Sequence, residues 1–236
     1  MEMENDDNKV KVIPPTTAHT HTVILLHGRE DTAEQFSSDF FESQASDKRF
    51  LPEIFPGVKW VFPKARMIRR APFDLDESQW FDMHSTDNPH SRHQDNKNDE
   101  QLDEAATIIT QIVQRETAII GTSKTFLGGI SQGCATAIYV LLRDDQSLAG
   151  FIGMSSWFPR HQRILDPKEP LETPVYLSHN HDDPTISIPF GEALRDGLVG
   201  LGMVVEWHVY GDDIHWINEP KGIDDMVAFL QRYMRS

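Results

Sequence analysis

The chain has 236 residues, of which 39% are hydrophobic and 25% charged, so it is long enough and apolar enough to bury a substantial core. Its formal net charge of −15 repels phosphate backbones, which argues against nucleic acid as a partner. A single cysteine, Cys134, excludes a framework of internal disulfides and fits a reducing compartment.

The first 21 residues are predicted to form a polar, mobile N-terminal arm that contains a break at Pro14 and Pro15. This arm is acidic and lacks the basic-then-apolar order of a secretory signal. No apolar run in the sequence approaches the ~20 residues of a bilayer span. We therefore expect a soluble, cytoplasmic protein without a stable membrane anchor.

From residue 22 onward, short apolar runs alternate with amphipathic segments, and no linker or repeat divides the chain. Strands are expected at 22–26, at 58–62, just before Gly129, and at 149–153, 175–178 and 203–209. Helices are expected at 33–45, 101–115, after Ser131, and at 190–201 and 223–233. This alternation predicts one α/β domain over residues 22–236, with a mostly parallel sheet and helices on both faces. Reacting groups then gather in loops at the carboxyl ends of the strands.

A long connection, residues 64–98, interrupts this alternation. Loops of such length in compact domains are usually functional or partly disordered. Its first half carries Trp80, Phe81 and Asp82 and is expected to pack, whereas residues 84–98 form a polar insertion that is expected to be mobile.

The sequence Gly129-Ile130-Ser131-Gln132-Gly133 follows an apolar strand and precedes a helix. This G-x-S-x-G pattern is typical of a nucleophile elbow, a turn so sharp that the serine hydroxyl is exposed in a strained conformation. Glycines at 129 and 133 fit because a side chain there would collide with the neighbouring strand or helix. The pattern predicts that Ser131 is a nucleophile.

A serine nucleophile needs a base that is oriented by an acid, and in hydrolases with this elbow the acid and then the base follow the serine. His215 lies immediately past the carboxyl end of a predicted strand and is favoured as the base over His208, which lies inside that strand. Asp182 and Asp183 both follow the preceding strand, and their spacing leaves the two open as the acid. We expect hydrolysis to fall at acid pH, because the imidazole must be neutral to accept a proton.

The oxyanion of such a reaction needs two backbone donors. One is the N–H of Gln132, the residue after the nucleophile. The turn His27-Gly28-Arg29, which ends an early strand, fits the other, with Gly28 permitting close approach and the Arg29 N–H donating.

These residues resemble the acyl-protein thioesterase / phospholipase–carboxylesterase family of α/β-hydrolases. The matching blocks are Leu26-His27-Gly28 with Asp31, Pro63, Ala65-Arg66, Trp80-Phe81-Asp82, the segment from Leu127 to Gly133, Asp183-Pro184 and His215. The resemblance implies the α/β-hydrolase fold and a triad of Ser131, Asp183 and His215. It favours Asp183 over Asp182 because the family's acid directly precedes the proline.

The resemblance also implies an oxyanion hole at Arg29 and Gln132, and substrates that are S-acylated proteins, lysophospholipids or small carboxylic esters. The chain departs from the family pattern His-Gly-Leu-Gly-Asp, because it has Arg29 and Glu30 in place of the leucine and second glycine. A backbone donor survives this change, but two charges replace apolar surface that a long acyl chain would contact.

Two other classes of function remain as alternatives. His179, His181 and Asp183 form an H-x-H-x-D run that a metal-dependent hydrolase could use, although Pro184 interrupts it. A non-catalytic ligand-binding protein could also keep the hydrolase fold. No dinucleotide or P-loop fingerprint is present, so we expect neither a cofactor nor a metal.

Overall fold

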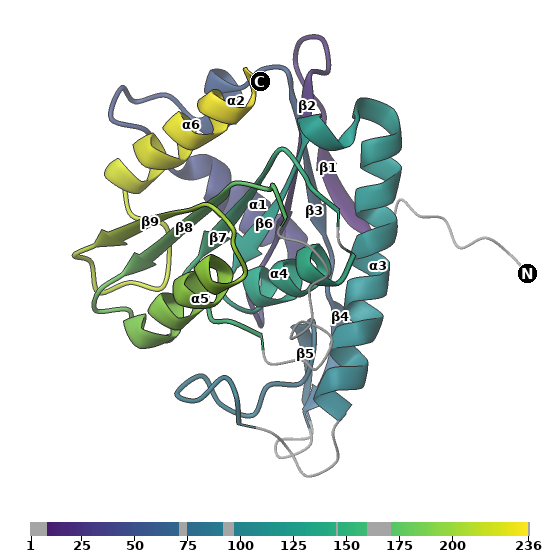
Figure 1. The fold of residues 1–236 in the computed structure, drawn as a ribbon, viewed down its shortest axis with the longest axis vertical. Helices are drawn as coiled ribbons and strands as arrows, with labels where there is room; N and C mark the ends of the chain where they lie inside the picture. The colour runs from purple at the N-terminus through teal and green to yellow at the C-terminus, as the bar shows by residue number, and fades with distance from the viewer. Residues whose placement is uncertain (1–8, 71–74, 92–96, 145, 160–170, 236) are drawn as a thin grey trace, which may run out of the picture.

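A seven-stranded sheet with the order β1-β3-β2-β6-β7-β8-β9 lies at the centre of the computed structural model, which describes residues 9–70, 75–91, 97–144, 146–159 and 171–235 (Figure 1). The strands are β1 (Val10–Ile13), β2 (His21–Leu26), β3 (Val58–Pro63), β6 (Thr125–Ile130), β7 (Gly150–Met154), β8 (Val175–Asn180) and β9 (Val205–Tyr210). All neighbouring pairs are parallel except β1 and β3. This arrangement confirms the predicted α/β architecture.

Helices cover both faces of the sheet. Successive strand residues point to opposite sides, so each face presents apolar side chains for the helices to cover. Val23 and Leu25 of β2 share one core cluster with α1 (Ala33–Glu42), α2 (Leu51–Ile54) and α6 (Lys221–Tyr233). Ile24 and Leu26 share the other with α3 (Lys97–Ile120), α4 (Gln132–Asp144) and α5 (Ile188–Gly200). Strands buried on both faces explain the continuous apolar runs that identified them.

The prediction of a polar, mobile arm over residues 1–21 is wrong for β1, which pairs antiparallel with β3 at the edge of the sheet. Only Val10 in this strand is buried, and Val12 is 37% exposed. Four residues with one buried side chain carry too weak a period-two signal to be found from sequence. The first eight residues of the predicted arm lie outside the described part of the chain.

The long connection contains a hairpin that the sequence did not predict, β4 (Arg66–Arg70) and β5 (Leu75–Gln79), paired antiparallel. These strands are rich in charged residues, and among their side chains that the structure describes only Ile68 and Gln79 are buried. Of the insertion predicted at 84–98, residues 92–96 lie outside the described residues and α3 begins at Lys97. None of the described helices is both long and apolar enough to cross a bilayer.

Candidate active site

Ser131 lies at a sharp turn between β6, which ends at Ile130, and α4, which begins at Gln132. Its φ of 54° is in the left-handed region, which a non-glycine residue rarely adopts. A Cβ built on Gly129 would lie 2.6 Å from the carbonyl oxygen of Leu26, and one on Gly133 would lie 2.4 Å from the same oxygen. Only glycine fits at either position, as the elbow requires.

The main chain of Ser131 is held on both sides. Its N–H donates to the Met154 carbonyl at 2.9 Å, and the buried Ser156 hydroxyl donates to the Ser131 carbonyl at 2.7 Å. These bonds fix the strained turn, so the serine side chain is presented from a rigid frame.

Asp183 and His215 form a hydrogen-bonded pair. The His215 Nδ1 lies 2.7 Å from Asp183 Oδ2, and Asp183 Oδ1 accepts the N–H groups of Thr185 at 2.8 Å and Ile186 at 2.9 Å. Because an ionised carboxylate only accepts, the proton of this bond sits on Nδ1 and leaves Nε2 with a lone pair.

The ionisation of Asp183 follows from these contacts. Burial of its carboxylate acts to raise its pKa, but the hydrogen bond and charge of His215 and the two N–H donors outweigh burial. The pKa of Asp183 therefore lies below its ordinary value of 3.8. The group is charged at neutral pH and can hold an imidazole in a fixed orientation.

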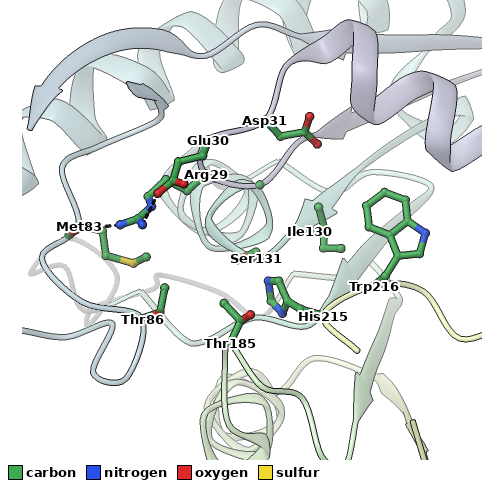
Figure 2. Close-up of a pocket in the computed structure, with 11 residues that line it drawn as sticks. Arg29, Glu30, Asp31, Met83, Thr86, Ile130, Ser131, Thr185, His215 and Trp216 are labelled. Carbon is green, nitrogen blue, oxygen red and sulfur yellow. Dashed lines mark hydrogen bonds and ion pairs between the residues drawn. The ribbon is translucent and has the colours of Figure 1, made fainter. Parts of the chain in front are cut away.

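Ser131 and His215 line one cavity of about 280 Å³ (Figure 2). The other lining residues are Gly28, Arg29, Glu30, Asp31, Met83, Thr86, Ile130, Thr185 and Trp216. Asp183 is 7% exposed and is not among them, so it reaches the cavity only through His215. The three residues come from the loops after β6, β8 and β9, at the carboxyl edge of the sheet.

The turn after β2 comes close to the serine. A Cβ built on Gly28 would lie 3.7 Å from the Ser131 Cβ, an ordinary contact, so sterics do not demand glycine there as the sequence had suggested. The His27 ring accepts the Ala65 N–H on Nε2 at 3.2 Å and donates from Nδ1 to the Gly28 carbonyl at 2.7 Å. Arg29 is thus placed beside the elbow by a buried, hydrogen-bonded histidine.

The Gln132 side chain has a role that the sequence did not reveal. Its Oε1 accepts the Trp80 N–H at 3.0 Å, and its Nε2 donates to the Phe81 carbonyl at 2.7 Å. The Trp80 indole N–H donates to the His27 carbonyl at 2.9 Å. The Trp-Phe-Asp block therefore joins the elbow to the turn after β2; its aromatic composition predicted packing, but not this partner.

The two charged residues of this turn, which stand where the family pattern has leucine and glycine, contact each other. Arg29 is ion-paired with Glu30, and its Nη1 donates to the Met83 carbonyl at 3.2 Å (Figure 2). Glu30 has a φ of 65°, a conformation that glycine adopts without strain. Both side chains line the cavity, so its wall on this side is a charged pair.

The other candidate residues have different partners. Asp182 is paired with His181 in an exposed contact, and His208 lies 3.3 Å from Asp225 of α6. His179 is buried, and its Nε2 lies 2.8 Å from the Ile186 carbonyl oxygen and 3.6 Å from Asp183 Oδ2. The three side chains of the H-x-H-x-D run do not form a metal-binding group, because no group of three or more such side chains occurs in the described ranges.

A seven-stranded, mostly parallel sheet with a serine elbow and a histidine–aspartate pair at its carboxyl edge defines an α/β-hydrolase. The family model for phospholipase/carboxylesterase matches residues 7–234, and the chain belongs to that family.

Among similar proteins, the acyl-protein thioesterase 1 of Cryptococcus neoformans is 29% identical over 194 residues, which are 79% of this chain and 76% of that protein. The acyl-protein thioesterase 1 of Gibberella zeae is 27% identical over 94% of both chains. The crystal structure of Arabidopsis thaliana SOBER1 superposes with a TM-score of 0.77 at 23% identity, covering 92% of this chain and all of that one. Zea mays acyl-protein thioesterase 2 gives 0.75 at 22% identity, covering 96% and 99%.

Proposed function

We propose that this protein is a serine hydrolase that cleaves carboxylic esters or thioesters through an acyl-enzyme on Ser131. The observation that carries the proposal is the pairing of His215 Nδ1 with the buried carboxylate of Asp183 beside the cavity that Ser131 lines. That pairing leaves the Nε2 of His215, which lines the same cavity as Ser131, as the ring nitrogen that can accept the serine proton.

In the first step, the Ser131 oxygen attacks the acyl carbonyl while His215 accepts the hydroxyl proton. The carbonyl oxygen takes up the negative charge, and the backbone N–H groups of Gln132 and Arg29 hold it. Gln132 is the first residue of α4, where N–H groups lack helical partners and the helix dipole favours an anion.

The tetrahedral species collapses when the bond to the leaving group breaks and His215 gives its proton to that alcohol or thiol. Water then attacks the acyl-enzyme by the same route, with His215 as base, and releases a carboxylic acid and free Ser131. Asp183 stays ionised throughout and stabilises the imidazolium that forms twice in each cycle.

The substrate class follows from the family and the relatives. The similar proteins from Cryptococcus neoformans and Gibberella zeae are acyl-protein thioesterases, which supports an S-acylated protein or a small acyl ester as the substrate. We also propose that the chain from β1 onward acts as one hydrolase domain and that the enzyme works in the cytoplasm.

Hydrolysis of a butyryl ester and the corresponding thioester tests the proposal. We expect wild-type protein to cleave both, Ser131→Ala to lose activity by about 10⁴-fold or more, and a chelator to have no effect. Loss of activity with the chelator would support a metal-dependent hydrolase instead, and a folded wild type without turnover would support a binding protein.

A further inference from the structure

The last residue of β8, Asn180, holds the loop that carries His215. Its side-chain amide donates from Nδ2 to the carbonyl of Ile214 at 2.9 Å and to the carbonyl of Trp216 at 2.8 Å. These are the residues immediately before and after His215, so one amide group bridges both sides of the histidine. Because both partners are acceptors, only the amino side of the amide can face them.

The same residue also contacts the turn that carries Asp183. The Asp183 N–H donates to the Asn180 carbonyl at 3.2 Å, which closes the turn after β8. Asn180 thus links the main chain of the acid to the main chain of the base, and no hydrogen bond joins it directly to either of their side chains in the described residues.

The His215 loop needs such an anchor. Residues Gly211, Asp213 and Ile214 are exposed, and His215 itself is only partly buried. Only after His215 does the loop gain apolar packing, through Trp216 and the buried Ile217, so the position of the part before it depends on hydrogen bonds to the sheet.

Packing alone does not account for an asparagine at this position. Asn180 is 1% exposed, and its Oδ1 is buried without a hydrogen-bond partner among the described residues. An unpartnered buried oxygen is unfavourable, so an apolar side chain would be the better choice for filling space. The amide supplies two N–H donors on one nitrogen, which an apolar side chain does not have.

We propose that Asn180 is a positioning residue that sets the His215 imidazole against Asp183 and Ser131. This role rests on the proposed function, since it concerns the base of that reaction. It predicts that Asn180 variants lose more kcat than a control variant that loses a comparable buried hydrogen bond elsewhere.

Two substitutions remove the donors in different ways. Asn180→Asp keeps the shape of the side chain but turns the donor into an acceptor, and Asn180→Ala removes the group without adding charge. For each, we expect kcat for a butyryl ester to fall about 100-fold with little change in KM, since a misplaced reacting group costs on this order. Because the two variants differ in charge and size, an equal loss in both isolates the missing donors.

Tyr176→Phe is the matched control. Tyr176 lies on the same strand, is fully buried, and donates from its hydroxyl to the Gly222 carbonyl at 3.2 Å, away from the His215 loop. We expect this variant to melt at a lower temperature and to keep kcat within about twofold, because it loses a buried hydrogen bond of similar kind. Asn180 variants that lose no more activity than Tyr176→Phe would overturn the proposal.

A spectroscopic readout separates this role from the proposed function. The Nδ1 proton that His215 shares with Asp183 should give a low-field proton resonance, assigned by its absence in His215→Gln. We expect the signal in wild type, Ser131→Ala and Tyr176→Phe, and its loss or broadening in Asn180→Asp and Asn180→Ala. An unchanged signal in folded Asn180 variants would overturn the positioning role, whether or not wild type hydrolyses esters.

Discussion

Two adjacent aspartates show how environment decides chemistry at the scale of a single residue. Asp182 is exposed and contacts an exposed histidine, whereas the carboxylate of Asp183 is fully buried and accepts three hydrogen bonds. Burial makes an ion-pair contact stronger and its geometry stricter, so the contact of Asp183 with His215 is better suited to hold an imidazole than the exposed contact of Asp182.

Asp183→Asn is therefore expected to reduce kcat by about 10⁴-fold, because the new amide can donate to His215 Nδ1 and would favour the wrong tautomer. Steady-state hydrolysis of a butyryl ester measures the effect. Asp182→Asn is the control and should keep wild-type activity. A similar loss in both variants would contradict the assignment of the acid.

Arg29 illustrates a residue whose side chain and backbone have separate consequences. Its N–H is the proposed oxyanion donor, and its guanidinium is tied to Glu30 and to the Met83 carbonyl in the cavity wall. Replacing the side chain leaves the backbone donor in place.

Arg29→Leu is expected to shift preference toward longer acyl chains. Each newly buried methylene contributes about 0.8 kcal/mol, so two would favour palmitoyl over butyryl thioester by about tenfold in relative kcat/KM. Glu30→Gln, which removes the ion pair but keeps a polar wall, is the matched comparison. An unchanged ratio in Arg29→Leu would show that this wall does not contact the acyl chain.

At the scale of elements, the β6–α4 elbow depends on the absence of two side chains. A Cβ on Gly133 would approach the carbonyl oxygens of His27 and Leu26 to 2.3 Å and 2.4 Å, and both oxygens belong to backbone that cannot move aside cheaply. The strand, the turn and the helix are thus joined at a point with no spare volume.

Gly133→Ala is expected to lower the free energy of unfolding by about 1–3 kcal/mol or to prevent folding. Gly28→Ala, whose Cβ would make only ordinary contacts, should unfold like wild type. Urea denaturation of wild type, Gly133→Ala and Gly28→Ala measures these differences. Equal midpoints for all three would mean that the elbow can relax.

The elements differ in how well the sequence predicted them. The strands β2, β3 and β6 are buried on both faces, so their apolar runs identified them directly. The hairpin β4–β5 and the edge strand β1 have few buried side chains, and their pairing partners supply the information that local pattern lacks.

The site shows the same division. The sequence could propose Ser131 and His215 because they follow strands in a recognisable order, and the resemblance favoured Asp183. Asn180 and the Gln132 side chain could not be found in this way, since each acts through hydrogen bonds to main-chain atoms distant in sequence. Such contacts follow no fixed separation along the sequence, so a single sequence does not reveal them.

For the whole molecule, buried histidines couple stability to pH. Burial lowers the pKa of His27 and of His179 below the ordinary value of 6.5. The unfolded chain therefore binds protons that the folded chain excludes, and stability falls as pH drops below about 6.5. The lowered pKa of Asp183 acts in a separate range, because its stabilisation is lost only as pH falls below the ordinary carboxyl value.

We expect the free energy of unfolding to decrease between pH 7 and pH 5 by up to about 1.4 kcal/mol per pH unit for each of the two histidines. Urea titrations at several pH values measure this slope. His179→Gln should reduce it, because that variant lacks one of the two buried imidazoles. A slope of the opposite sign would contradict the burial argument.

Whether the molecule is an active serine hydrolase depends on one property, the reactivity of the Ser131 hydroxyl. Labelling with a fluorophosphonate, read by mass spectrometry of the intact and digested protein, measures it directly. We expect a single adduct on Ser131 in wild type and none in Ser131→Ala. A folded wild-type protein that remains unlabelled, or is labelled at another residue, would contradict the proposed nucleophile.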